Sequence, residues 1–219
     1  LIIEQTLWNE NKKLLEFPPS WKGYIEPFAQ DLDIVLAETN HHYFYQNKYV
    51  KPKIAYNVWE STLQPDQFFE KLLEFDQLWV PTQWQKDCSI KQGYPEDKVK
   101  IVHEGLDSSF FPIPYSEVKG KFKFIILGRW DHRKFTTEIL QAFQDVFGYN
   151  PNVELIASID NPFALDGLTT EQRLEKENIT CSNIKIYHFP PKEEYIKLLQ
   201  NSHCYLSCAR SEGWGRTLH

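Results

Sequence analysis

The chain has 219 residues, of which 42% are hydrophobic and 25% are charged, and its formal net charge is −6. This composition is ordinary for a globular protein with a buried core and excludes a mostly disordered chain. An acidic balance without any block of Lys and Arg argues against a nucleic-acid partner. No apolar stretch approaches the ~18–20 residues of a membrane-spanning helix, although peripheral association with a membrane surface stays open.

In the first half of the chain, short apolar runs alternate with helical segments. We expect strands at 33–37, 54–59, 78–80 and 99–102, and helices at 65–75 and 82–92. Helical spacing predicts that Phe68, Phe69, Leu72 and Leu73 form the buried face of the first helix. The second helix should end at Gly93.

The second half shows the same alternation more clearly, after a Pro- and Gly-containing stretch at 110–120 that predicts an interdomain linker. We expect strands at 121–127, 153–159, 184–187 and 203–207, and helices at 134–147, 168–178 and 191–200. The predicted buried positions are Ile139, Leu140, Phe143, Val146 and Phe147 in the first of these helices, and Tyr195, Ile196 and Leu199 in the last. Repeated strand–helix–strand units predict an α/β fold with parallel sheets and helices on both faces.

The four cysteines are Cys88, Cys181, Cys204 and Cys208, and they form neither a CxxC pair nor a zinc-binding spacing. In a strand, Cys204 and Cys208 would stand ~13 Å apart, which is too far for a disulfide. We therefore expect all four to be small buried hydrophobic side chains in a reducing compartment, which favours the cytoplasm.

The loop after the predicted strand 121–127 carries the sequence GRWDHRK and is the first candidate site. Ligands of open α/β sheets bind beyond the carboxyl ends of the strands. Arg129 and Lys134 would converge on an anion at the start of the next helix, where the backbone dipole also favours negative charge. Arg offers planar paired donors and Lys a mobile charge, which suits a diphosphate. The alternative is a solvated cationic turn.

The loop after the predicted strand 203–207 is the second candidate, with the sequence SEGWG. Its two glycines would let the backbone approach a ligand closely. Glu212 would accept hydrogen bonds from neighbouring sugar hydroxyls. A turn with a packed Trp214 is the alternative interpretation.

Three segments in order along the chain resemble one family of enzymes. They are YNVWEST with the following VPTQW and GLDSSFF, then FIILGRWDHRK, and then YIKLLQNSHCYLSCARSEGWG. Over about residues 52–215 the chain resembles glycosyltransferases of the GT-B fold and the GT4 type. The resemblance implies two Rossmann-like parallel-sheet domains, an N-terminal acceptor-side domain at 1–115 and a C-terminal donor domain at 116–219. It implies transfer of a sugar from a nucleotide-diphosphate sugar to a hydroxyl of a carbohydrate, lipid or protein acceptor.

On the donor side, the resemblance implies that Arg129 and Lys134 bind the diphosphate and stabilise the charge that builds on the leaving nucleotide. Glu212 would bind sugar hydroxyls, and Glu212, Arg129 and Lys134 would be the catalytic residues. The backbone amides expected beside Glu212 are those of Gly213, Trp214 and Gly215. Family members generally retain the anomeric configuration and need neither a metal nor another cofactor.

On the acceptor side, Glu60 of the W-E-S element would face the cleft, with a helix-capping or surface role beside Ser61 as the alternative. His41 follows the predicted strand 33–37 and is a second acceptor-side candidate. For isolated histidines such as His188 we expect structural roles. The D-x-D triplet that begins at Asp31 precedes a strand instead of following one, so we interpret it as a connection and expect no metal.

The chain departs from the family at its end. The resemblance implies a second glutamate eight residues after Glu212, at position 220, and the sequence ends at His219. The sequence also contains no methionine. We therefore expect the donor domain to be incomplete in this chain. Two alternatives to a glycosyltransferase follow: a non-catalytic or partner-dependent half-protein that binds a sugar nucleotide, and a GT-B nucleotide-sugar epimerase.

Overall fold

The chain forms two compact units in the computed structural model, which describes residues 33–36, 53–111, 113–114 and 120–218. Unit 1 comprises the described residues up to Gly105 together with Glu212–Trp214. Unit 2 comprises Leu106–Ser211 and the residues from Gly215 onward. The predicted boundary between residues 115 and 116 lies outside the described residues.

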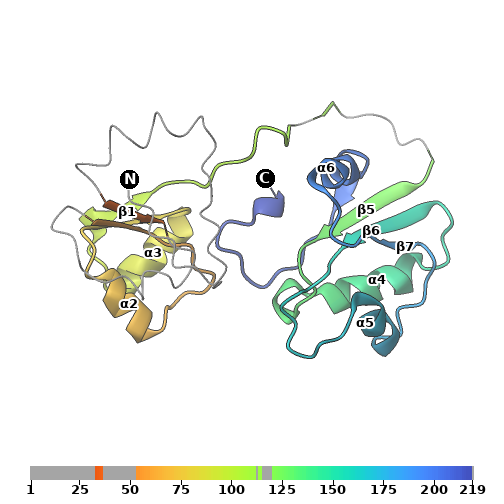
Figure 1. Ribbon diagram of the computed structural model, residues 1–219, viewed down its shortest axis with the longest axis horizontal. Helices are drawn as coiled ribbons and strands as arrows, with labels where there is room; N and C mark the ends of the chain where they lie inside the picture. Colours follow the sequence, from red (N-terminus) through yellow and green to blue (C-terminus); the bar gives the residue numbers. More distant parts are fainter. Residues whose placement is uncertain (1–32, 37–52, 112, 115–119, 219) are drawn as a thin grey trace, which may run out of the picture. The chain divides into compact units, whose positions relative to one another are not determined.

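Unit 1 is built on a four-stranded parallel sheet in the order β1-β2-β3-β4 (Figure 1). The strands are β1 (Asp33–Leu36), β2 (Lys53–Tyr56), β3 (Gln77–Val80) and β4 (Val99–Ile101). The α-helices are α2 (Asp66–Leu72) and α3 (Gln83–Gln92), and a 3-10 turn spans Glu96–Lys98. Thr82 caps α3 by accepting a hydrogen bond from Gln85 N at 3.1 Å, and Gly93 ends the helix with a φ of +116°.

The core of unit 1 lies between this sheet and α2. Ala55, Leu78 and Val99 are register partners on three adjacent strands, and all three are buried in one cluster with Leu72. Leu73, which we predicted to face inward, is 47% exposed. The reason is that α2 ends at Leu72, so Leu73 lies in the turn beyond the helix.

Unit 2 is built on a second four-stranded parallel sheet, in the order β7-β6-β5-β8. The strands are β5 (Phe122–Leu127), β6 (Val153–Ser158), β7 (Ile184–Ile186) and β8 (Cys204–Tyr205). The α-helices are α4 (Thr136–Phe147), α5 (Thr170–Lys176) and α6 (Lys192–Gln200), and 3-10 turns span His132–Lys134 and Arg216–Leu218. The predicted α/β fold with two parallel sheets is confirmed.

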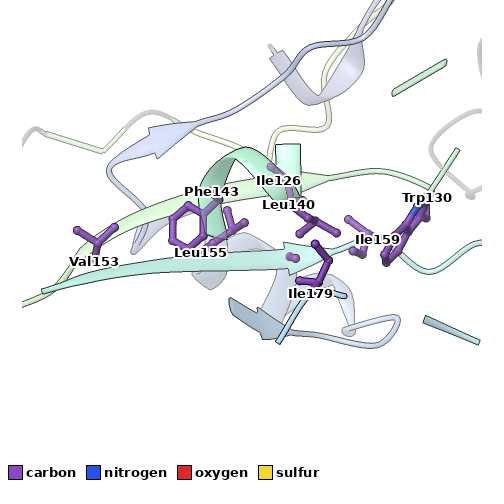
Figure 2. Packing of buried hydrophobic residues seen from close by; sticks show 9 residues of the cluster. Ile126, Trp130, Leu140, Phe143, Val153, Leu155, Ile159 and Ile179 are labelled. Carbon is purple, nitrogen blue, oxygen red and sulfur yellow. The ribbon is translucent and has the colours of Figure 1, made fainter. Parts of the chain in front are cut away.

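Helices cover both faces of the second sheet, with α4 and α5 on one face and α6 on the other (Figure 1). Ile126 and Leu155 pack toward α4, whereas Ile125 and Ile156 pack toward Leu198 of α6. Burial on both faces explains why these strands read as continuous apolar runs instead of alternating ones. The interior of the α4 side forms a row of side chains that runs along the sheet (Figure 2).

Several side chains are less buried than the sequence predicts. Val146 is 69% exposed because it lies on the flank of α4, outside the stripe formed by Leu140, Phe143 and the half-buried Phe147. On α6 the buried residue is Leu198, between the predicted Tyr195, Ile196 and Leu199, which are half-buried.

The cysteine prediction was wrong about burial. The four thiols are free, Cys88, Cys181 and Cys204 are half-buried, and Cys208 is exposed. Because β8 ends at Tyr205, Cys208 lies in the loop beyond the sheet. Among the residues that the structure describes, no helix is both long and apolar enough to cross a membrane.

The buried row predicts the effect of a cavity in unit 2. Leu155→Ala should lower the free energy of unfolding by about 2–5 kcal/mol, because Leu155 is 0% exposed and its lost side chain leaves a cavity. The matched control is Leu165→Ala, whose side chain is fully exposed and whose loss should change stability by less than ~0.5 kcal/mol. Urea denaturation followed by circular dichroism measures both. Equal losses in the two variants would contradict this packing.

Candidate functional site

The loop after β5 is anchored to the sheet by its own backbone. Gly128 N donates to Ser158 O at 3.1 Å, and Trp130 N donates to Ile159 O at 2.7 Å. The Trp130 ring is buried beside Ile159 at one end of the core row, and its Nε1 donates to Thr137 Oγ1 at 3.0 Å (Figure 2). The loop therefore continues the β5–β6 pairing and is fixed on both sides of Arg129.

A short turn then fixes the backbone of Lys134. Asp131 Oδ1 accepts a hydrogen bond from Lys134 N at 2.9 Å and caps the 3-10 turn His132–Lys134. Phe135 follows with a φ of +56°, a left-handed conformation that is uncommon for a bulky residue. Helix α4 begins directly after it and has no side-chain hydrogen bond at its N-cap. The first backbone amides of a helix are donors without a partner inside the helix, and they favour an anion.

A small cavity of about 20 Å³ lies where β5 and β8 end. Its lining includes Gly128, Lys134 and Thr136 from the β5 side and Tyr205 and Ser207 from the β8 side. A Cβ atom on Gly128 would lie 3.7 Å from Lys134 Cε, and the φ of +114° at Gly128 is one that side-chain-bearing residues rarely adopt. A space of this size accommodates about one water molecule.

The Arg129 side chain extends from the same loop toward the loop after β6. It is exposed, and its guanidinium carbon lies 5.4 Å from the centre of the Phe163 ring in the loop after β6. This distance is within the range of a cation–π contact. The structure thus places the two predicted diphosphate ligands, Arg129 and Lys134, on one loop at the carboxyl edge of the second sheet.

Two arginines that the sequence analysis passed over connect this loop to the loop after β8. Arg210 N donates to Arg133 O at 2.8 Å, and Arg133 Nη1 donates to Ser211 O at 2.5 Å. Arg133 and Ser211 lie 78 positions apart along the chain, so no local pattern could have indicated their contact.

Glu212, Gly213 and Trp214 belong to unit 1, whereas Gly215 belongs to unit 2, so the predicted sugar-binding loop is shared between the units. Within unit 1, a Cβ atom on Gly213 would lie 2.4 Å from Val58 Cγ1. The packing of this glycine leaves no room for a side chain unless Val58 moves.

Two further contacts define this part of unit 1. The Trp214 ring lies 5.3 Å from the ring of His103, to which we had assigned no role, and His103 Nδ1 lies 2.7 Å from Pro81 O. The acceptor-side candidate Glu60 is half-buried. It directly follows Trp59, whose backbone also lies near Gly213. The other acceptor-side candidate, His41, lies outside the described residues.

A polar cluster at the ends of β6 and β7 was also missed. His188 Nδ1 lies 3.0 Å from Asp160 Oδ1, and His188 Nε2 lies 2.9 Å from Glu171 Oε1. Thr170 Oγ1 donates to Asp160 as well. The hydrogen bond to Asp160 raises the pKa of His188 above its usual value, and the charges of both carboxylates add to this shift. Hydrogen bonds from the backbone and Thr169 lower the pKa of Glu171.

In the described parts of the chain, no group of three or more His, Cys, Asp or Glu side chains is arranged to hold a metal ion.

The structure is similar to solved glycosyltransferases. The apo lipopolysaccharide outer core galactosyltransferase WaaB superimposes with a TM-score of 0.60 at 12% identity, over 91% of this chain and 56% of WaaB. HepE from Anabaena in complex with UDP superimposes with a TM-score of 0.64 at 15% identity, over 84% of this chain and 56% of HepE. Apo OtsA superimposes with a TM-score of 0.60 at 15% identity, over 90% of this chain and 59% of OtsA. The chain has the GT-B fold.

The similarity covers only part of those structures, and it is a similarity of fold at low sequence identity. The chain spans little more than half the length of WaaB, HepE and OtsA. No protein-family model and no curated protein sequence matches it.

The His188 cluster predicts a titration that is shifted upward. The pKa of His188 should exceed that of a histidine in a short peptide, because Asp160 and Glu171 stabilise the imidazolium. A raised folded-state pKa means that this contribution to stability is fully present below about pH 6.5 and is lost as the pH rises through the folded pKa. An NMR titration of the His188 Hε1 resonance measures the pKa. Asp160→Asn should shift the midpoint downward, and an unchanged midpoint would contradict the assigned cause.

Proposed function

We propose that the chain belongs to a glycosyltransferase that moves a sugar from a nucleotide-diphosphate sugar to an acceptor hydroxyl. The observation that carries the proposal is that Arg129 and Lys134 both lie on one anchored loop at the carboxyl edge of a parallel sheet. Ligands of such sheets bind at this edge. HepE, which shares the fold, has been solved in complex with UDP, a nucleoside diphosphate, and this supports the proposal.

The diphosphate would interact with two kinds of positive charge in unit 2. Lys134 lies beside the end of β5, and α4 begins with amides that no side chain caps. Arg129 would close on the same anion from the exposed side of the loop, because its guanidinium is not buried. Fixed donors that face the leaving diphosphate would stabilise charge that develops as the glycosidic bond to the nucleotide breaks. These cations would do what a metal ion does elsewhere, so the proposal includes a metal-independent reaction. From the resemblance to GT4-type enzymes, it also includes retention of the anomeric configuration.

The rest of the site is part of the same proposal. Glu212 would accept hydrogen bonds from sugar hydroxyls, beside the backbone amides of Gly213, Trp214 and Gly215. Glu60 and His41 would approach the acceptor, which is a hydroxyl of a carbohydrate, a lipid or a protein. The reaction would take place in the cytoplasm, where nucleotide sugars are available to the enzyme.

The two alternative functions, a partner-dependent half-protein and an epimerase, differ from a glycosyltransferase in the reaction that the chain would catalyse alone. A partner-dependent half-protein would bind the nucleotide and transfer sugar only after a complementary chain is added. An epimerase would change or release the sugar without any acceptor. A turnover assay with and without acceptor therefore separates all three.

Loss of either cation should weaken nucleotide binding. Arg129→Ala and Lys134→Ala should each reduce the affinity for a nucleoside diphosphate about 10–100-fold, because each loses a charged hydrogen bond of about 1.5–3 kcal/mol. Calorimetry with UDP, GDP and ADP identifies the base that the wild type binds and measures the loss. The charge-matched control is Lys185→Ala, on the exposed side of β7, which should bind like the wild type. Unchanged affinity in both loop variants would contradict the diphosphate assignment.

Loss of the Glu212 carboxylate should affect transfer more than nucleotide binding. Glu212→Gln should lower kcat/KM for sugar transfer by about 10-fold or more, since its oxygens would meet the sugar in the transition state. Its affinity for the nucleoside diphosphate alone should stay within about threefold of the wild type. Equal losses in the two measurements would place Glu212 at the nucleotide instead. The transfer assay is repeated with EDTA, and a complete loss of activity there would contradict metal independence.

A further inference from the structure

The loops after β5 and β8 hold each other through both backbone and side chains. Arg210 N donates to Arg133 O at 2.8 Å, and the Arg133 guanidinium donates to Ser211 O at 2.5 Å. Arg133 thus takes part in both bonds, as acceptor through its carbonyl and as donor through its guanidinium, and its partners Arg210 and Ser211 are neighbours in the loop after β8. We call this pair of bonds, with the Arg210 side-chain contacts described next, the arginine latch.

The Arg210 side chain adds two contacts to a residue pair of the first loop. Its guanidinium carbon lies 4.3 Å from the centre of the Phe135 ring, and its Nη1 lies 3.1 Å from His132 Nε2. The His132 and Phe135 rings stack on each other with an interplanar angle of 17°. Arg210 therefore contacts the start and the end of the segment that contains Lys134.

Phe135 joins the 3-10 turn to α4 in an uncommon backbone conformation. Its φ of +56° lies in the left-handed region, which is costly for a residue with a bulky side chain and persists only where neighbours hold it. Phe135 directly follows Lys134 and precedes the first residue of α4. A change in its backbone would move the Lys134 side chain and redirect the first amides of α4 together.

We propose that Arg210 is a positioning residue for the diphosphate site. It holds the Phe135 ring and the Arg133 carbonyl, and so keeps Lys134 and the first turn of α4 ready for the anion before the anion arrives. This inference rests on the proposed function, because it assigns Arg210 a role toward the same diphosphate. It differs from direct binding, in which the Arg210 guanidinium would itself contact the ligand.

The chemistry of the contact determines the variants. A guanidinium lies flat on an aromatic ring and still donates at its edge, whereas an ammonium is a compact point charge. Arg210→Lys keeps the charge and removes this geometry, and Arg210→Gln removes both. Phe135→Leu removes the ring and leaves Arg210 in place. The Arg210 side chain is exposed, and surface substitutions usually change global stability by less than ~0.5 kcal/mol, so the Arg210 variants should fold.

The experiment measures loop order without ligand and affinity with ligand. Hydrogen exchange of peptides that cover residues 130–138 is followed in the nucleotide-free chain, and calorimetry uses whichever of UDP, GDP and ADP the wild type binds. In Arg210→Gln, Arg210→Lys and Phe135→Leu we expect about two- to fivefold faster exchange and about two- to fivefold weaker binding, the effect of losing one exposed cation–π contact. The double variant Arg210→Gln/Phe135→Leu should be no worse than either single variant, because both remove the same contact. Lys197→Gln on α6 is the control and should leave both measurements unchanged.

The outcomes separate the inference from the proposed function. Weaker binding in Arg210→Gln with unchanged exchange, or full affinity in Arg210→Lys, would overturn positioning and indicate that Arg210 contacts the anion through its charge. Unchanged exchange and unchanged affinity in all variants would overturn the role assigned to Arg210. In that case, nucleotide binding by the wild type would still support the proposed function. A wild-type chain that binds none of the three nucleotides would overturn the proposed function and, with it, the role assigned to Arg210.

Discussion

The parallel pairing of β5 with β6 is the interaction on which the rest of unit 2 depends. Six register pairs run from Phe122 and Val153 to Leu127 and Ser158, and both faces of the pair are buried under helices. Because the two strands end level with each other, the loops that follow them begin side by side at one edge of the sheet. The backbone bond from Trp130 to Ile159 carries the pairing one step beyond the strands. The contacts of Arg129 and of the His132–Lys134 turn are positioned from this edge.

The loop after β5 contains both residues that anchor it and residues that are exposed. Trp130 is buried and Asp131 caps the turn, while Arg129 is exposed. This division explains how a short loop can be rigid and still present charge. With Arg133, Lys134 and Arg210, the loops after β5 and β8 gather four cationic side chains in a chain of net charge −6. The same loops also carry the carboxylates of Asp131 and Glu212, but cations outnumber them, and a local excess of positive charge attracts an anion that the protein as a whole would repel.

The sequence predicted the parts of the fold that depend on local pattern. The apolar run that became β5 and the 3.6-residue spacing of α4 were identified within two residues of their observed ends. Errors appeared where an element ended early: Leu73 lies just past α2, and Cys208 lies past a strand of two residues. A hydrophobic pattern does not show where a strand stops pairing with its neighbour or where a helix ends. The burial of the residues at the end of each element depends on that position.

The candidate site was predicted only as far as its motifs extend. Arg129 and Lys134 were found because a short loop joins a clear strand to a clear helix. The contacts of Arg133, Arg210 and His188 join segments that follow different strands, and their partners can be seen only once the sheet order is known. Residue type alone gave these side chains no function. Topology brought them together, which is the information that a single sequence lacks.

The two left-handed residues of the β5 loop have different consequences. Gly128 adopts its φ of +114° at no steric cost, so the turn out of β5 needs no outside support. Phe135 adopts its φ of +56° at a cost, and the Arg210 guanidinium lies on its ring. The entry into α4 therefore depends on a loop that is distant in sequence, whereas the exit from β5 does not. By linkage, an anion that binds Lys134 and the first turn of α4 would also stabilise the loop after β8, and an ordered β8 loop would strengthen anion binding by the same factor.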